Sequence, residues 1–281
     1  MKRFATGLSH FVFEVTTTYG MIYVVRIAFP ARKGELEAGL YWHRLLATIG
    51  LPLPALYQTG VMRAHPFAIY ERLPGDDLEA LYSTLTSRTK QHIAHTVANI
   101  QKKARLLDKS AFPKTPPAWQ TILEIIVRRS EREILRAAQF DPVYVAYVRE
   151  LIHRYAGYFE TIEPVAFLYD LNVRNVIVHQ EAVAGVIDVD EVWYGDPLLS
   201  IGRGKSLLLT AQQKSDYIDY WCSYIGLSDM QLKMVDLYAL LYCIRFMGTS
   251  GLQLNGNDSL QTDARNAPRL ETVVQELLQV L

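Results

Sequence analysis

Strand-like and helix-like patterns divide unevenly along this chain of 281 residues. Alternating runs rich in β-branched and aromatic residues fill residues 1–73 and recur in one short island at 166–188, whereas the rest has helical periodicity. Strands and helices that segregate in this way are typical of an α+β fold. We therefore predict a small antiparallel-sheet lobe over residues 1–73 and a mainly helical lobe over residues 74–281, divided at the Pro74-Gly75 turn.

The first lobe is predicted to hold two strand pairs with a helix between them. The predicted strands span residues 11–15, 21–29, 55–62 and 65–73. Gly20 marks the first turn, because glycine accepts the positive φ that tight hairpin turns require. Residues 35–50 have helical character and finish at Gly50, a common helix C-terminal signal. The predicted order is ββαββ.

The second lobe is predicted to be helical on both sides of the island. Ser87 is a plausible N-cap for a long amphipathic helix. The apolar residues on one face of that helix are Ile93, Val97, Ile100, Ala104 and Leu107. Further helices are predicted over residues 119–138 and 142–160, and from about Ser206 onward, where a loop over residues 248–259 precedes a last helix.

Charge and cysteine content exclude several classes of protein. Lys+Arg and Asp+Glu are 29 each, so the net charge is zero, and we expect neither nucleic-acid nor membrane partners. Cys222 and Cys243 are too few for a disulfide framework and are expected to be buried free thiols. The N-terminus has no apolar signal-peptide core, which predicts a soluble, cytoplasmic protein.

Polar residues flank the β island where its strands begin and end. The runs 175–179 and 183–188 are predicted to form a hairpin, with Asn175 starting its first strand and Asp188 ending its second. An antiparallel pair brings these two ends together. Asp170 precedes Asn175 by five positions and can reach the same place. The sequence thus predicts two carboxylates and an amide at one mouth.

This set of oxygens suits a magnesium–nucleotide site. Mg²⁺ prefers hard oxygen ligands and usually combines one or two carboxylates with substrate phosphates. The remaining carboxylate can accept the proton of a hydroxyl that receives a phosphoryl group. An Asp-x-x-x-x-Asn motif followed by an Asp at the end of a hairpin is the spacing of a kinase catalytic loop.

The ordered motifs resemble the aminoglycoside phosphotransferase / choline kinase-like family over nearly the whole chain. The motifs that carry this resemblance are GLSHFVFEV, YVVRI, GLPLP, YERLPG, YDLNVRNVIV and GVIDVDEVWYGDP. The resemblance implies a protein-kinase-like two-lobed fold. It also implies ATP- or GTP-dependent phosphoryl transfer, helped by Mg²⁺, to a hydroxyl group of a small molecule. The oligomeric state is left open.

The resemblance also implies roles for individual residues. Asp170 would be the catalytic base, and Asn175 and Asp188 would be the metal ligands. Arg26 would contact nucleotide phosphates and pair with Glu37 on the following helix, with Glu35 as the alternative. The other implied nucleotide-binding residues are Gly7 and Ser9 in a phosphate-covering loop and Glu71, Arg72 and Leu73 in an adenine-binding hinge.

Asp190 and Glu191 would face the acceptor substrate. Plainer interpretations stay open for several of these residues. Arg26 could be a surface ion-pair partner, Glu37 could belong to a solvated helix face, and the Asp190-Glu191 pair could be rim charges.

The catalytic loop departs from the family pattern. Leu168 and Tyr169 stand where the family has His and Gly before the catalytic Asp, and Ser200 stands where a structural Asp is usual. These changes favour an alternative function, a pseudokinase that binds nucleotide or a partner without catalysis. A non-catalytic helical scaffold is a third hypothesis, and the retained Asp170, Asn175 and Asp188 argue against it.

Overall fold

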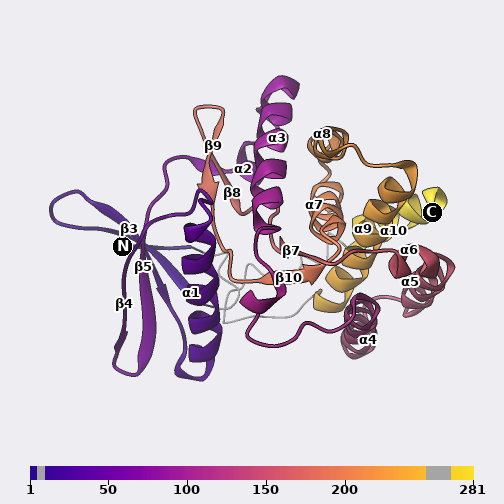
Figure 1. Cartoon of the computed structure of the whole chain (residues 1–281), viewed down its shortest axis with the longest axis horizontal. Helices are drawn as coiled ribbons and strands as arrows, with labels where there is room; N and C mark the ends of the chain where they lie inside the picture. Colours follow the sequence, from indigo (N-terminus) through magenta and orange to yellow (C-terminus); the bar gives the residue numbers. More distant parts are fainter. Residues whose placement is uncertain (5–9, 251–266) are drawn as a thin grey trace.

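The computed structural model describes residues 1–4, 10–250 and 267–281. It confirms a small antiparallel sheet followed by a mainly helical remainder (Figure 1). In sheet order, the five N-terminal strands are β1 (Lys2–Arg3), β2 (Phe11–Thr16), β3 (Ile22–Ile27), β5 (His65–Glu71) and β4 (Leu56–Met62). The predicted hairpin turn is present, since Gly20 has a φ of +80°.

Helix α1 (Lys33–Thr48) covers one face of this sheet and follows the short 3₁₀ turn η1 (Pro30–Arg32). Its buried Leu36 and Leu40 form a small core with Ala28, Ala68 and Tyr70 from the sheet. Burial of these side chains is what holds the helix against the strands. Gly50 has a φ of +72°, which matches the predicted helix end.

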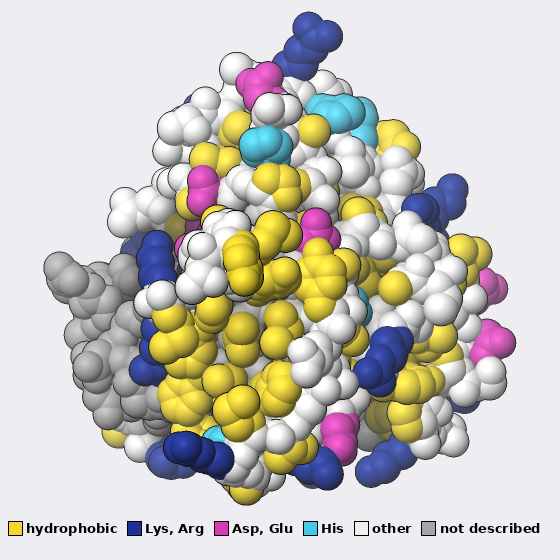
Figure 2. All heavy atoms as spheres, turned by 90° about the vertical axis from the view of Figure 1, so that its left-hand side faces the viewer, with side chains coloured by type: hydrophobic (Ala, Val, Ile, Leu, Met, Phe, Trp, Pro, Cys, Tyr) yellow, Lys and Arg dark blue, Asp and Glu magenta, His cyan; other side chains and the backbone are white. Residues whose placement is uncertain are grey.

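The opposite face of the sheet carries hydrophobic side chains that are only partly covered. Strand alternation places Phe13, Val25 and Ile69 in register on this face. Tyr57 and Val61 on edge strand β4 are exposed. Figure 2 shows hydrophobic side chains gathered over this side of the molecule.

The second part of the chain is built around α9 (Asp229–Thr249), which packs against α7 (Leu198–Thr210), α4 (Trp119–Ala137) and α10 (Ala267–Val280). Long, apolar and buried along most of its length, α9 is the central helix of this core. The other helical elements are α2 (Leu78–Leu81), α3 (Ser87–Ala104), η2 (Lys109–Ala111), α5 (Val143–Arg154), α6 (Ala156–Glu160) and α8 (Asp216–Ile225).

The β island forms two small sheets between the N-terminal sheet and the helices (Figure 1). Strand β8 (Val176–His179) pairs with β9 (Ala182–Val186) in the predicted hairpin, and β6 (Asp76–Asp77) pairs with the other edge of β8. Strand β7 (Val165–Leu168) pairs antiparallel with β10 (Val192–Gly195). Residues 169–175 connect β7 to β8, and residues 187–191 connect β9 to β10. Both segments therefore pass between the same two small sheets.

Two expectations about the whole chain can be compared with the structure. Cys222 and Cys243 are free and buried, as predicted. No helix among residues 1–4, 10–250 and 267–281 is long and apolar enough to cross a membrane. The lobe boundary after residue 73 stays a prediction.

Candidate active site

The hairpin β8–β9 brings Asn175 and Asp188 together, as the sequence predicted. Val176 pairs with Val186 in the strand register, and the backbone N–H of Ile187 donates to the carbonyl of Asn175 over 2.9 Å. Asp188 follows directly, with a φ of +55° and a side chain that is 48% exposed. The left-handed backbone is uncommon for a residue other than glycine, and it turns the chain sharply at this carboxylate.

Hydrogen bonds from two asparagines shape the loop around Asp170. The side-chain amide of Asn172 donates to the Asp170 carboxylate, and its side-chain oxygen accepts from the backbone N–H of Arg174. The amide nitrogen of Asn175 donates to the backbone carbonyl of Asp170 over 2.8 Å. This bond leaves the side-chain oxygen of Asn175 as the atom that can bind a cation.

Arg203 is a residue of this site that the sequence analysis missed. Its guanidinium forms an ion pair with the Asp170 carboxylate over 2.8 Å. The rings of Tyr169 and Tyr242 lie 4.9 and 5.5 Å from the guanidinium, within cation–π range. One signal was available: Arg203 is a lone arginine inside the apolar run of α7.

Burial dominates the ionisation of Asp170 and raises its pKa to about 6. Arg203 opposes this effect, whereas Asp188 and Glu191 add to it through charge repulsion. A carboxylate of this kind is mostly ionised at neutral pH and still close enough to its pKa to accept a proton.

The residues that replace the expected His and Gly have their own contacts. Leu168 is buried, and both its backbone N–H and its carbonyl bond to the side chain of Gln101, over 2.9 and 3.1 Å. Tyr169 stacks on Trp193 with a centroid distance of 3.9 Å and an interplanar angle of 12°. Ser200 donates from its hydroxyl to the carbonyl of Leu171 over 3.5 Å.

Arg26 lies at the same mouth, but its partners differ from those predicted. Its guanidinium pairs with Asp188 over 3.2 Å and with Asp190 over 2.5 Å. The predicted pair with Glu37 is wrong for the described structure, in which Glu37 is exposed and pairs with Lys33 over 3.5 Å. Burial lowers the pKa of Arg26, but Asp188 and Asp190 raise it above its ordinary value, so the guanidinium stays charged.

The alternative partner, Glu35, pairs with Arg32 over 3.6 Å. Asp190 has a partner that the sequence did not predict, because its carboxylate contacts Arg26 and lies beside Gly39 of α1. Its position at the acceptor stays a prediction. Glu191 is exposed and lines a small hollow next to Asp170. Its role at the acceptor stays a prediction.

The predicted hinge joins β5 to the remainder of the chain. The side chain of Glu71 accepts a hydrogen bond from the backbone N–H of Ala55 over 3.0 Å. Arg72 pairs with Glu14 over 3.1 Å and donates to the carbonyl of Leu73. An adenine-binding role for residues 71–73 stays a prediction, and the predicted phosphate-loop residues Gly7 and Ser9 lie outside the described residues.

The donor set at this mouth fits Mg²⁺. Asp188 offers an exposed carboxylate, and Asn175 offers an amide oxygen because its nitrogen is already bonded. Mg²⁺ commonly takes one or two protein oxygens and completes its shell with water and phosphate oxygens. Within the described part of the chain, no cluster of three or more His, Cys, Asp or Glu residues could hold a metal by itself.

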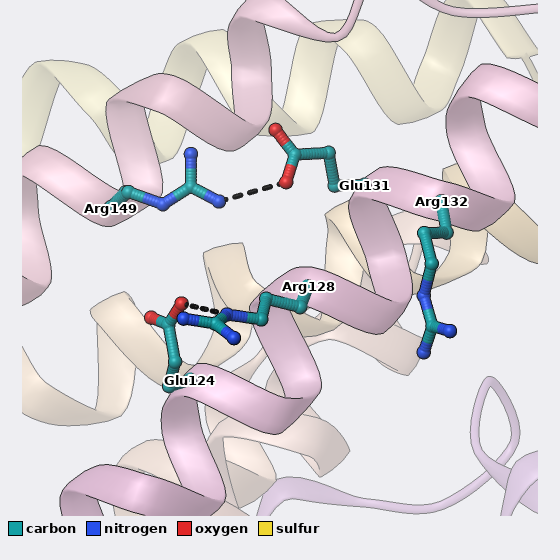
Figure 3. A pocket seen from close by; sticks show the side chains of 5 residues that line it. All are labelled: Glu124, Arg128, Glu131, Arg132 and Arg149. Atoms are coloured by element: carbon teal, nitrogen blue, oxygen red, sulfur yellow. Dashed lines mark hydrogen bonds and ion pairs between the residues drawn. The ribbon is translucent and has the colours of Figure 1, made fainter.

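A separate hollow of about 720 Å³ lies between α4 and α5 (Figure 3). Four of its five lining side chains form ion pairs: Arg128 with Glu124 over 2.6 Å and Arg149 with Glu131 over 2.9 Å. It contains none of the predicted site residues. It is therefore separate from the predicted nucleotide site.

Comparison with known proteins identifies the family. The model of the phosphotransferase enzyme family matches residues 1–222. The chain belongs to this family. No protein with a curated function matches the sequence.

Solved structures of aminoglycoside phosphotransferases share the fold. A thermostable mutant of aminoglycoside phosphotransferase APH(4)-Ia, in its apo form, matches with a TM-score of 0.67 and 17% identity over 98% of this chain and 93% of that chain. A mutant of an aminoglycoside 2'-phosphotransferase-IIIa in complex with GDP matches with a TM-score of 0.70 and 15% identity over 99% and 90% of the two chains. The predicted kinase-like fold is thereby confirmed.

Proposed function

We propose that this phosphotransferase-family protein transfers a phosphoryl group from ATP or GTP to a hydroxyl of a small molecule. The observation that carries the proposal is the convergence of Asp170, Asn175, Asp188 and Arg26 at one mouth. Two of these residues offer oxygens for a cation, one offers a positive charge for phosphates, and one offers a base. Among the solved relatives, one is a ternary complex with streptomycin and ATP and another is a ternary complex with ADP and hygromycin B.

Each residue has a defined task in this reaction. Asn175 and Asp188 would hold Mg²⁺, which when bound neutralises charge on the transferring phosphoryl group. Arg26 would bind phosphate oxygens. Asp170 would orient the acceptor hydroxyl and take its proton, and Arg203 would hold that carboxylate in place. Most of the catalysis would come from positioning and charge stabilisation.

Charge pairing in the site indicates how much positive charge the acceptor substrate can carry. Asp170 pairs with Arg203, and Asp190 pairs with Arg26. Arg129 donates a hydrogen bond to Glu133, and this bond raises the pKa of Arg129 against the effect of burial, with smaller contributions from the charges of Glu133, Tyr169 and Glu191. A strongly polycationic acceptor needs a surplus of acidic groups. We therefore propose an acceptor with little or no positive charge.

A second candidate function is nucleotide binding without catalysis. It is favoured by the replacement of the residues before Asp170 and by the ion pair that already engages the Asp170 carboxylate. The two functions agree on nucleotide binding and differ on phosphoryl transfer. An assay of ADP release from ATP separates them. Phosphoryl transfer releases ADP, either with an acceptor hydroxyl or more slowly with water as the acceptor, whereas binding without catalysis releases none.

A thermal-shift titration with ATP and GTP, each with and without Mg²⁺, tests the nucleotide site. Ligand at 100 times its Kd adds about 2.7 kcal/mol of stability. In a protein of this size that raises the Tm by roughly 5 °C. Asp188→Asn should abolish the Mg²⁺-dependent part. Asp76→Asn, the same change at an exposed aspartate, should leave it intact. No shift with either nucleotide would overturn the proposal.

A further inference from the structure

The acidic partners of Arg26 lie on a different element from the one that the sequence predicted. Both of its acidic partners, Asp188 and Asp190, lie on the segment that follows β9, and neither lies on α1. The shorter contact is to Asp190, and both side chains are largely buried, with exposures of 14% for Arg26 and 22% for Asp190. A partly buried arginine needs such a partner to keep a fixed position.

Helix α1 provides space for this carboxylate. A Cβ atom added to Gly39 would lie 2.6 Å from the carboxyl carbon of Asp190, closer than any real contact of this type. Gly34 on the same helix has nothing within 4 Å of its added Cβ. Glycine destabilises a helix interior by about 0.5–1 kcal/mol relative to alanine, so the contact gives Gly39 a structural reason.

We propose that Asp190 is the positioning residue for Arg26, and that Gly39 on α1 makes room for its carboxylate. A side chain from α1 does not perform this task, because Glu35 and Glu37 pair with residues near the start of their own helix. The phosphate-binding arginine and the metal-binding Asp188 are then held by one short segment. This inference rests on the proposed function for the part that concerns phosphates, and on geometry alone for the ion pair.

The geometry allows a double substitution to move the carboxylate from the segment after β9 to helix α1. The carboxyl carbon of a glutamate lies two bonds, or about 2.5 Å, from its Cβ. That distance matches the 2.6 Å between the added Cβ at Gly39 and the carboxyl carbon of Asp190. In the double variant Gly39→Glu/Asp190→Ala, the helix can therefore place a carboxylate at the same point beside Arg26.

Calorimetric titration with MgATP tests the phosphate-related part. Loss of one partly buried charge partner is worth about 1.4 kcal/mol, a tenfold change in Kd. Asp190→Ala and Gly39→Ala should each raise the Kd about tenfold, and the exchange variant should return it to within about threefold of the wild type. Gly34→Ala is the matched control and should bind as the wild type does. Wild-type affinity in both single variants, or no recovery in the exchange variant, would overturn the proposal.

Urea unfolding without nucleotide tests the ion pair separately. Arg26→Met and Asp190→Ala should each increase the equilibrium constant of unfolding. The increase in the double variant should be about tenfold smaller than the product of the two single increases. Independent effects would overturn the pairing of Arg26 with Asp190. If the wild type binds no nucleotide but this coupling is present, the proposed function fails and the positioning of Arg26 by Asp190 stands.

Discussion

Removal of Arg203 measures how strongly a buried guanidinium holds the Asp170 carboxylate. The pair is 2.8 Å long, and the two side chains are 18% and 23% exposed. Breaking a buried pair from one side costs about 3–5 kcal/mol when the other charge stays unpaired. Asp170 can avoid part of this cost by binding a proton, because burial raises its pKa to about 6. We therefore expect Arg203→Met to lose about 2 kcal/mol of stability at pH 8.

The assay is urea unfolding in EDTA of four proteins: the wild type, Arg203→Met, Asp170→Asn and the double variant. At pH 8 the double variant should be about 2 kcal/mol more stable than the sum of the single losses predicts. At pH 5 this coupling should fall below about 0.5 kcal/mol, because Asp170 is then protonated in the native state.

The sign of the pH effect follows from the raised pKa of Asp170. Its unfolded pKa is about 3.9, so the native protein binds this proton more tightly than the unfolded chain does. The resulting stabilisation is complete below pH 4 or so and is lost as the pH rises through about 6. Asp170→Asn lacks this loss, so its stability relative to the wild type should rise over that interval.

Two results would refute this reasoning. Additive losses at pH 8 would mean that the guanidinium and the carboxylate do not interact in solution. Equal coupling at pH 5 and pH 8 would mean that the coupling comes from uncharged contacts, such as the packing of Arg203 between Tyr169 and Tyr242.

Two further changes test the core and a largely buried polar network. Gly195→Ala should cost about 3 kcal/mol in urea unfolding, because the added Cβ would lie 2.0 Å from the buried ring of Trp119; a loss below about 0.5 kcal/mol would contradict the packing. Burial raises the pKa of Asp216, but hydrogen bonds from Tyr82 and Lys90 outweigh it and lower the pKa below its ordinary value. Asp216→Asn should therefore cost about 1 kcal/mol at pH 7, and the difference should shrink below pH 4 or so; a loss that does not vary with pH would contradict a charged network.

Local patterns predicted most of the secondary structure. Gly20 and Gly50 were read correctly as a turn and a helix end, because both signals depend on the backbone of a few neighbouring residues. The long helix was also found, although its N-cap is Thr86 and not Ser87; the Thr86 side chain accepts from the backbone N–H of Thr89. Errors of one residue are expected where two hydroxyl residues are adjacent.

Tertiary packing explains the larger errors. Helix α7 begins at Leu198, eight residues before the predicted start at Ser206. Gly202 weakens the helical pattern of the sequence there. The structure explains why glycine is needed at this position: a Cβ on Gly202 would lie 2.5 Å from the Cβ of Tyr238 on α9. The predicted helix over 142–160 is divided at Tyr155, and strand β10 was missed because it needs β7 as its partner.

The contacts of the candidate site also divide into local ones, which the sequence predicted, and distant ones, which it did not. The proximity of Asn175 and Asp188 could be predicted because a single hairpin creates it. The partner of Arg26 lies more than 160 positions away, and the partner of Asp170 comes from a helix whose start was misplaced. Spacing along the chain carries no information on such contacts.

The altered catalytic loop is best judged by what replaced the missing groups. If Leu168 and Tyr169 had accumulated by decay, the backbone groups of Leu168 would be expected to lack hydrogen-bond partners and the ring of Tyr169 to lack stacking partners. Instead, Gln101 bonds to both backbone groups of Leu168, and the ring of Tyr169 stacks on Trp193 and lies 4.9 Å from the guanidinium of Arg203. The Nε atom of Arg203 and the hydroxyl of Tyr242 beside it are buried without a hydrogen-bond partner among the described residues. The contacts of Leu168 and Tyr169 fix the loop that carries Asp170. Replacements that restore support to a loop preserve its geometry, and preserved geometry is needed for a base but not for a site that only binds nucleotide. The compensation therefore supports phosphoryl transfer over a pseudokinase, and the ADP-release assay decides between them.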